Sequence, residues 1–297
     1  MAKTQSLQIA QAFDFYKLDA QARLVTKSTL RTYDDRIKPF VNWCKLQQVT
    51  SLADIKPATV RTYIVHLNNR KLSDYTINGV GRALRAWFNF CVREKLISES
   101  PMATVKVPRP GKRILPALNT ADIKKLLDVC QTERDEAIIL FLLDTGCRAT
   151  ELISLNCGDI DNKTGTVLVR QGKGKKDRIV YVGAKTRKQL FRYLIHRDKP
   201  AENDPLWLSE RRDSRLTTAG LRQLLLRLGR HASVGRVSPH VFRRTFAISS
   251  LRNGMSIYHL QRLMGHADID VLKQYLDLVE SDAKAAHEKY GVVDNLK

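Results

Sequence analysis

Near the C-terminus, the stretch GHADIDVLKQY places a histidine, His266, nine residues before a tyrosine, Tyr275. A tyrosine hydroxyl has an ordinary pKa of about 10, so it attacks a substrate only when cationic groups or a base lie beside it. On this stretch alone, the simpler interpretation of Tyr275 is a half-buried aromatic on a short helix. The chemical interpretation depends on whether the rest of the chain supplies the cations.

One candidate cation, Arg148, lies in the stretch DTGCRATEL, directly after the turn expected to end a hydrophobic helix. A guanidinium is planar and presents a fork of N–H donors, which fits the oxygens of a phosphate. An arginine at a helix start can instead pair with the nearby Glu151. Taken alone, Arg148 is more simply explained by that ion pair.

A second candidate, Lys173, stands between two glycines in QGKGKKDR, at the expected tip of a β-hairpin. Glycines let the backbone approach a ligand closely, and a lysine at such a tip can donate a proton. A solvated turn would have the same composition. The stretch lacks the full spacing of a nucleotide-binding P-loop and no Ser or Thr follows the lysine, which argues against ATP binding.

The stretch SPHVFRRTFA predicts a helix that begins near Pro239 and carries His240 and Arg243 on one face, at i and i+3. A helix N-terminus with a histidine and an arginine on one face is an anion site. A zinc site would require a partner pattern such as H-E-x-x-H, which the sequence lacks. A capping or core histidine remains the alternative for His240.

Together these residues fit nucleophilic attack on a phosphodiester. The arginines would neutralise the non-bridging oxygens in the transition state, and the lysine would protonate the departing oxygen. The histidines would handle the proton of the tyrosine and a further phosphate contact. A covalent phosphotyrosine conserves the energy of the broken bond, so we expect no cofactor, no ATP and no metal ion.

The order Arg, Lys, His-x-x-Arg, His, Tyr, at these spacings, resembles the tyrosine recombinase (lambda-integrase-like) family, and the overall size is similar to that of its simple two-domain Xer-type members. The resemblance covers nearly the whole chain. Carried over position by position, it implies the catalytic set Arg148, Lys173, His240, Arg243, His266 and Tyr275. It further implies a 3′-phosphotyrosyl intermediate, a free 5′-hydroxyl and a Holliday junction.

The resemblance also implies partners. These are double-stranded DNA carrying inverted-repeat recombination sites, a homotetramer on two such sites and, in some systems, a second recombinase.

Two features depart from the family pattern. Arg244 stands where many members have a histidine or an uncharged residue, and Asp270 to Gln274 occupies the place of a frequent Thr-Thr pair. These departures leave the nucleophile assignment unchanged and affect local packing and the delivery of the tyrosine.

The elements that must position these residues are mostly helical. Apolar residues at helical spacing predict helices over 28–47, 59–67, 73–91, 119–130, 136–146, 216–232, 238–254 and 256–266. Pro57, Ser73 and Thr120 are the expected start signals of three of them, and Gly146 is an expected C-terminal stop. Alternation on both sides of a Gly-Lys cluster predicts a β-hairpin over 165–183.

Periodicity breaks at Ser100 to Pro116, a stretch with four prolines and four basic residues. We therefore expect a helical domain over 1–105, a basic Pro-rich linker over 106–116 and a mixed domain over 117–297. The resemblance implies that the first is a core-binding domain that clamps DNA and that the last is the catalytic domain. The resemblance implies that the catalytic domain is of the DNA breaking-rejoining type and ends in an interaction helix. The predicted fold class is mainly α with a small antiparallel β-sheet (α+β).

The charge points to a polyanionic partner. The chain carries 51 Lys plus Arg against 30 Asp plus Glu, a net charge of +21. The first 105 residues hold 16 basic and 8 acidic side chains, so the excess is not confined to a tail. Such a field attracts nucleic acid. A ribosomal protein or a membrane-surface binder would have a similar charge, and the sequence favours DNA over both.

Localisation follows from what the sequence lacks. No apolar run approaches the roughly 20 residues of a membrane-spanning helix, and the N-terminus shows no signal-peptide core. The cysteines form an odd, scattered set without a C-x-x-C pair: Cys44, Cys91, Cys130, Cys147 and Cys157. We expect a protein of the bacterial type that works on the nucleoid in the cytoplasm, a reducing compartment, without a membrane partner.

Three other functions remain open at this point. A non-catalytic DNA-binding protein on the same scaffold would explain the charge and the helices but leaves the Arg/Lys/His/Tyr set unused. A type IB topoisomerase shares the phosphotyrosine chemistry but relaxes supercoils without two matching sites. A metal-dependent nuclease is the least favoured, because the sequence shows no clustered carboxylates.

Overall fold

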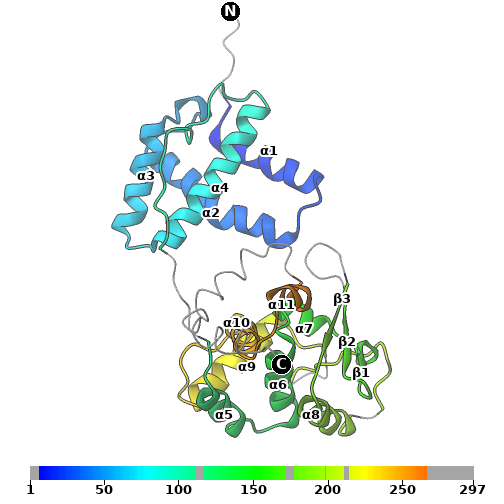
Figure 1. Cartoon of the computed structure of the whole chain (residues 1–297). Coiled ribbons are helices and arrows are strands. Elements are labelled where there is room, and N and C mark those ends of the chain that lie inside the picture. The colour runs from blue at the N-terminus through cyan, green and yellow to red at the C-terminus, as the bar shows by residue number, and fades with distance from the viewer. Residues whose placement is uncertain (1–6, 112–116, 171–176, 198, 211–213, 266–297) are drawn as a thin grey trace, which may run out of the picture. The chain divides into compact units, whose positions relative to one another are not determined.

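The protein divides into two compact units, Met1–Ile114 and Leu115–Lys297. The computed structural model describes residues 7–111, 117–170, 177–197, 199–210 and 214–265. Three predicted site residues, Lys173, His266 and Tyr275, and the predicted C-terminal interaction helix lie outside the described residues. The two units are described separately below (Figure 1).

Unit 1 is a helical bundle. Its helices are α1 (Ile9–Ala22), α2 (Lys27–Leu46), α3 (Pro57–Asn69) and α4 (Asp74–Arg93), with a short 3₁₀ helix at Leu52–Asp54. The start signals act as predicted. Pro57 opens α3, and the Ser73 hydroxyl accepts a hydrogen bond from the Thr76 N–H at 3.3 Å to cap α4. The three helices predicted over 28–47, 59–67 and 73–91 are confirmed.

Aromatic side chains fill the centre of unit 1. Trp87, Phe88 and Phe40 are fully buried, and the Phe40 ring meets the other two edge-on. The Trp87 indole N–H donates to the Ala12 carbonyl at 3.3 Å, which ties α4 to α1. Because a buried indole N–H without a partner is costly, this bond fixes how α1 lies on the bundle.

The proline-containing segment after α4 packs on that helix over its first part. The Asn78 amide donates to the Pro108 carbonyl at 2.8 Å, and Arg85 donates to the Val105 carbonyl at 3.0 Å. Val107 lies so close to Gly81 that a Cβ there would come within 2.6 Å of its side chain. Residues as far as Pro108 therefore belong to the packed body of unit 1.

Unit 2 combines helices with a small sheet. Its helices are α5 (Thr120–Asp128), α6 (Glu133–Thr145), α7 (Ala149–Ser154), α8 (Ala184–Ile195), α9 (Thr218–His231), α10 (Pro239–Arg252) and α11 (Ile257–Met264), with a 3₁₀ turn at Cys157–Asp159. Strands β1 (Ile160–Asp161), β2 (Thr166–Val169) and β3 (Arg178–Tyr181) form one antiparallel sheet in the order β1-β2-β3. The predicted hairpin is confirmed by the pairing of β2 with β3. The mainly helical α+β fold class is therefore confirmed.

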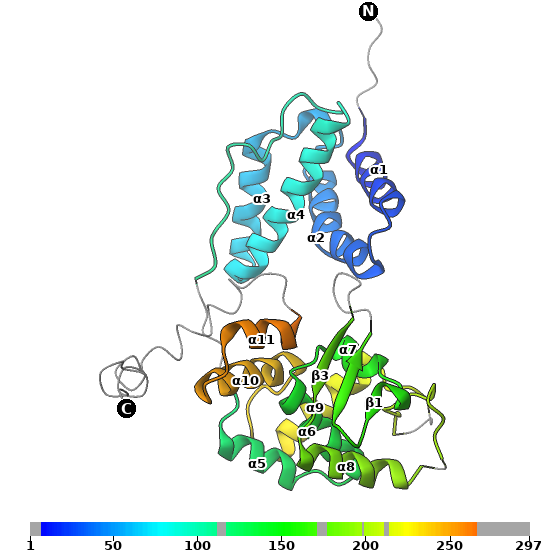
Figure 2. The ribbon, with the colours of Figure 1, turned by 45° about the vertical axis from the view of Figure 1, so that its right-hand side comes forward.

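The buried helix α6 organises unit 2, packing against α8 and α10 (Figure 2). The Thr132 hydroxyl caps its start by accepting from the Asp135 N–H at 3.1 Å. Gly146 ends it with a φ of +56°, where a Cβ would lie 2.4 Å from the Phe246 ring. The stop predicted at Gly146 is confirmed, and the glycine is required both for its backbone conformation and for this close contact.

Sequence reasoning misplaced one cap and did not name some elements. Asn119, and not Thr120, caps α5, because the Asn119 side-chain oxygen accepts from the Asp122 N–H at 2.8 Å. Thr120 is instead the first helical residue. Apolar spacing did not predict α1, α8 or the two-residue strand β1. Within the described ranges, no helix has the length and apolar character needed to cross a membrane.

Candidate active site

The N-terminal turn of α10 carries two predicted site residues, His240 and Arg243. Pro239 stands at the first helical position, so the helix begins where the sequence predicted. Arg243 is only 6% exposed. Its two terminal nitrogens donate to the Gly146 and Met264 carbonyls, each at 2.6 Å. The guanidinium is thereby fixed between the C-terminal ends of α6 and α11.

Arg148 is the residue that precedes α7. Its backbone N–H donates to one Glu151 carboxylate oxygen at 2.7 Å, and its Nη1 donates to the other at 2.7 Å. Its Nη2 also reaches the Gly265 carbonyl at 3.4 Å. The ion pair with Glu151, left open by the sequence, is therefore present. It holds the guanidinium in one orientation while 22% of the side chain stays exposed.

Glu151 is a junction that sequence reasoning considered only as a partner of Arg148. The Arg178 guanidinium binds the same carboxylate in a bidentate manner, with both N–O distances at 2.8 Å. Burial opposes the charged form of Glu151. The hydrogen bonds from Arg178 and from the Arg148 backbone and side chain outweigh it and lower the pKa of the carboxyl to about 2. Glu151 is therefore a carboxylate throughout the physiological range.

Arg178 is the residue that the sequence analysis missed. It opens β3, and its Nε donates to the Leu263 carbonyl of α11 at 2.8 Å. Its place at the start of a predicted strand, five residues after Lys173, gave no signal, because a charged residue there is usually solvated. We call Arg148, Arg178 and Arg243, with Glu151, the arginine cluster.

The electrostatics of the cluster favour binding of an anion. Burial and the neighbouring Arg148 lower the pKa of Arg243 to about 10, so the guanidinium stays charged at neutral pH under repulsion from a like charge. Partial burial, followed by Arg243 and Arg222, lowers the pKa of His240 below its ordinary value of 6.5. At neutral pH the imidazole is therefore neutral and able to accept a proton.

The three arginines bind three consecutive carbonyls at the end of α11. Arg178 takes Leu263, Arg243 takes Met264 and Arg148 takes Gly265. The last carbonyls of a helix have no partners within it, so the cluster satisfies them from outside. His266 follows directly in the sequence. Because the charges of Arg243 and Arg148 also act on His240, the structure brings Arg148, His240 and Arg243 together.

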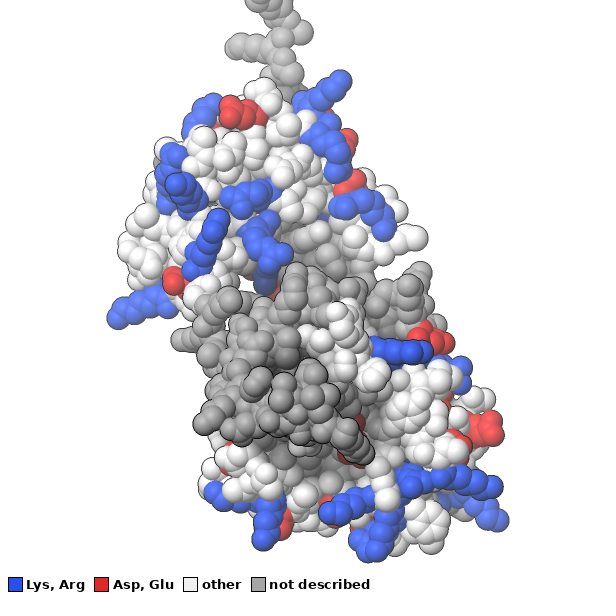
Figure 3. Space-filling view, viewed as in Figure 1, with Lys and Arg blue, Asp and Glu red and all other residues white. Residues whose placement is uncertain are grey.

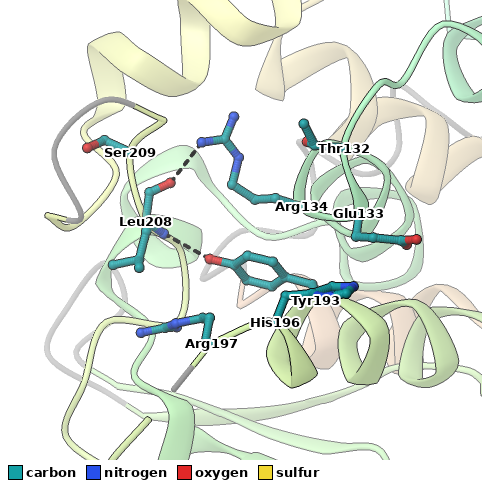
Figure 4. A pocket seen from close by; sticks show the side chains of 8 residues that line it. All are labelled: Thr132, Glu133, Arg134, Tyr193, His196, Arg197, Leu208 and Ser209. Carbon is teal, nitrogen blue, oxygen red and sulfur yellow. Dashed lines mark hydrogen bonds between the residues drawn. The ribbon is translucent and has the colours of Figure 1, made fainter. Parts of the chain in front are cut away.

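A separate cavity of about 310 Å³ lies at the other end of α6 (Figure 4). Tyr193 and Arg134 both contact Leu208 across it. The Tyr193 hydroxyl accepts from the Leu208 N–H at 3.2 Å, and Arg134 donates to the Leu208 carbonyl at 3.1 Å. None of the predicted site residues lines this cavity.

Among the described residues, His, Cys, Asp and Glu form no group of three or more placed to hold a metal ion.

A mixed domain that brings two arginines and a histidine together, after a helical domain, has the charge and the donors suited to binding a phosphate group. Comparison with known families shows to which family the chain belongs. The chain belongs to the phage integrase family: the pattern described as "Phage integrase family" matches residues 116–281, and "Phage integrase, N-terminal SAM-like domain" matches residues 15–95. The protein is accordingly a tyrosine recombinase of the Xer-like type, a site-specific DNA recombination enzyme.

The sequences of known relatives are similar to this chain over most of their length. Tyrosine recombinase XerC of Bacillus licheniformis is 31% identical, covering 84% of this chain and 86% of the relative. Tyrosine recombinase XerA of Thermococcus kodakarensis is 29% identical, covering 97% of each. The crystal structure of the XerH site-specific recombinase bound to a palindromic difH substrate has the same fold, with a TM-score of 0.72, 22% identity and coverage of 96% and 85%.

Proposed function

We propose that this recombinase cleaves DNA by attack of the Tyr275 hydroxyl on a scissile phosphate that Arg148 and Arg243 hold. The observation that carries the proposal is the geometry of these two guanidiniums. Two backbone carbonyls fix Arg243, and Glu151 together with the Gly265 carbonyl fixes Arg148. Donors fixed before the substrate arrives cost no reorganisation during the reaction, which is the arrangement that stabilises a charged transition state.

The remaining residues complete the chemistry. Tyr275 forms a bond from its oxygen to phosphorus while the bond from phosphorus to the 5′-oxygen breaks, which leaves a 3′-phosphotyrosine. Lys173 gives a proton to the departing 5′-oxygen. His240, with its lowered pKa, accepts the proton of the tyrosine, and His266 contacts the phosphate. Attack by a 5′-hydroxyl from a second duplex reverses these steps, so a Holliday junction forms without ATP or a metal ion.

Unit 1 fits a DNA-clamping role for residues 1–105. Figure 3 shows Lys and Arg side chains spread over its visible face. Exposed examples are Arg61 on α3 with Arg82 and Arg85 on α4. Contacts from such residues to phosphates would supply affinity without reading sequence. We assign residues 106–116 as the linker, whose first residues, as far as Pro108, pack on α4. We assign 117–297 as the catalytic domain, whose last segment docks on a neighbouring protomer in a tetramer on two inverted-repeat sites.

The nucleophile is tested with a suicide DNA substrate that carries a nick beside the cleavage position. Tyr275→Phe is expected to abolish covalent protein–DNA adducts in denaturing gels and to leave DNA binding nearly unchanged, since only the attacking oxygen is lost. The matched control is Tyr258→Phe, because Tyr258 on α11 is 72% exposed and its hydroxyl makes none of the described hydrogen bonds. Adducts that persist in Tyr275→Phe would reject the assignment.

Metal dependence is tested in the same assay. Adduct formation is expected to continue in EDTA, because the arginines provide the charge that a metal ion would otherwise supply. Loss of cleavage in EDTA, with recovery on adding Mg²⁺, would favour a metal-dependent nuclease instead.

A further inference from the structure

Arg178 has its donors committed within the protein. In the described structure it gives two hydrogen bonds to Glu151 and one to the Leu263 carbonyl, all at 2.8 Å. Its side chain is 10% exposed, against 22% for Arg148. Both terminal nitrogens of Arg178 bind the Glu151 carboxylate, whereas those of Arg243 bind only carbonyls, so the charge of Arg178 is already compensated within the protein. Its effect on the reaction must therefore pass through the groups that it holds.

We propose that Arg178 is a positioning residue of this active site, which holds the Glu151 carboxylate so that Glu151 orients Arg148 without neutralising it. The proposal rests on the function proposed above, since it concerns the charge that Arg148 offers to the phosphate. The hydrogen bonds of Glu151 are the first support for this proposal. Each of its carboxylate oxygens accepts from Arg178 and also from Arg148, once from the Arg148 side chain and once from its backbone.

The charge balance of the cluster carries the second step. With Arg178 in place, the negative charge of Glu151 is shared between two guanidiniums. Without Arg178, the whole negative charge of Glu151 is paired with Arg148. The attraction between Arg148 and a bound phosphate is then largely cancelled. Because Glu151 is only 4% exposed, water screens this effect poorly. The wild-type arrangement therefore gives Arg148 a fixed orientation together with a surplus of positive charge.

The contacts to α11 carry the third step. Arg178 pairs with Val169 in the sheet, and Lys173 belongs to the sequence that joins these two residues; Arg178 also binds the Leu263 carbonyl. Gly265 lies against it, with a φ of +60° and a Cβ position 3.0 Å from the Arg178 Cδ. One side chain thus joins the hairpin, Glu151 and the end of α11 just before His266.

The first experiment compares Arg178→Met with Arg134→Met. Arg134 is a matched control, because its side chain is 11% exposed and it also pairs with a buried carboxylate, Asp135. Single-turnover adduct formation is measured on a saturated protein–DNA complex. Arg178→Met is expected to slow it by about 10- to 100-fold, as for lost hydrogen bonds to a charged group, and Arg134→Met by less than about threefold.

The salt dependence of DNA binding separates positioning from direct contact. A residue that touches a phosphate contributes about 0.9 to the slope of log affinity against log salt concentration. Arg178→Met is expected to leave this slope unchanged. A slope reduced by about that amount would show Arg178 on the DNA and would overturn the proposal.

The second experiment adds Glu151→Gln. In the wild-type background this change is expected to slow cleavage, because Arg148 loses its ion pair. In the Arg178→Met background it is expected to restore at least about threefold of the lost rate, because it removes the uncompensated carboxylate. A purely structural role predicts the opposite sign, a further loss in the double variant. Arg178→Lys, which keeps the charge, is expected to cleave faster than Arg178→Met.

The double variant Arg178→Met with Glu151→Gln also tests the proposal where the single variant fails to fold. If Arg178→Met does not fold, the double variant replaces it and is expected to cleave within about 30-fold of wild type, since both buried charges are removed together. A loss as complete as that of Arg148→Ala would overturn the proposal. Wild-type cleavage by Arg178→Met would overturn it too, while leaving the Tyr275 assignment intact. Adducts in Tyr275→Phe would instead reject the proposed nucleophile.

Discussion

The two ends of helix α6 each carry a network of arginines and carboxylates, and the two networks differ in charge balance. At the N-terminal end, Asp135 binds Arg134 at 2.6 Å and Arg227 at 3.0 Å, and Glu210 binds Arg227 at 3.1 Å. We call this group the paired network. At the C-terminal end, about 20 Å along the helix, lies the arginine cluster.

The paired network matches two arginines with two carboxylates. Within the described part of the chain, the arginine cluster has three arginines and one carboxylate, Glu151, which pairs with Arg148 and Arg178. Arg243 instead donates to the Gly146 and Met264 carbonyls. The C-terminal network therefore carries about two uncompensated positive charges in a partly buried setting, where they repel one another.

This difference separates a network that stabilises a fold from one that binds an anion. Buried ion pairs that are balanced contribute to the unique packing of a core, and breaking one is costly. A surplus of one charge is unfavourable until a ligand compensates it, which is why perturbed charges gather at functional sites. Burial first, and then repulsion from Arg148 within this surplus, lower the pKa of Arg243 to about 10. A phosphate would compensate it.

The largest expected effect is on stability, at the paired network. Asp135 is 1% exposed and holds two arginines, so Asp135→Asn leaves buried positive charge without its partner. We expect a loss of about 3–5 kcal/mol in the free energy of unfolding, measured by urea denaturation. The cleavage rate per folded molecule is expected to stay within about threefold of wild type. A large loss of cleavage in the folded fraction would mean that both networks serve the reaction.

The next effect is on cleavage, at the arginine cluster. Arg243→Ala is expected to slow single-turnover cleavage by about 10²- to 10³-fold, as when one fixed donor to a transition-state charge is lost. Arg134→Ala, which removes a buried arginine from the paired network, is the control and is expected to change cleavage by less than about threefold. Equal losses in the two variants would show that the charge surplus carries no catalytic meaning.

The sequence predicted the positions of most helices and the hairpin, because their apolar spacing and their stop and start signals are local. It also brought Arg148, His240 and Arg243 forward as candidates, and the fold places them together. Their shared surface depends on the ends of α6, α7, α10 and α11 meeting in space. Local spacing contains no such information, so the common site rested on the family resemblance.

Arg178 was beyond sequence reasoning for a physical reason. A charged residue that opens a strand is usually solvated, and nothing in the hairpin pattern indicates burial against α11. The paired network was missed for the same reason, since Asp135 and Arg227 are 92 residues apart. By contrast, the cap of α5 was assigned to the wrong neighbour, Thr120, because adjacent Asn and Thr are both good capping residues.

Glu151 offers a pH test that sharpens the comparison. Its folded pKa of about 2 lies below its ordinary value of 4.5, so its charge stabilises the folded state above about pH 4.5. That contribution, about 3 kcal/mol, is lost as pH falls through the folded pKa. Glu151→Gln lacks it at every pH. The stability gap between wild type and variant is therefore expected to shrink by about half between pH 5 and pH 3, measured by denaturation at each pH.

A gap that stays constant over this range would show that Glu151 is not held as a carboxylate by the two arginines. The pairing of Glu151 with Arg178 would then not support the proposal that Arg178 keeps Glu151 from neutralising Arg148. Glu210→Gln is a useful control, because that carboxylate is 52% exposed in the paired network and surface ion pairs contribute little.

The smallest effect is expected at the cap of α6. Thr132 Oγ1 accepts from the Asp135 N–H, so Thr132→Ala is expected to cost about 1 kcal/mol in unfolding free energy, and Thr132→Ser much less. Because the cap lies at the end of α6 away from the arginine cluster, cleavage by the folded protein is expected to be unchanged in both variants. If Thr132→Ala slowed cleavage while Thr132→Ser did not, α6 would transmit the state of its capped end to Gly146, and the two networks would have to be treated as one coupled unit.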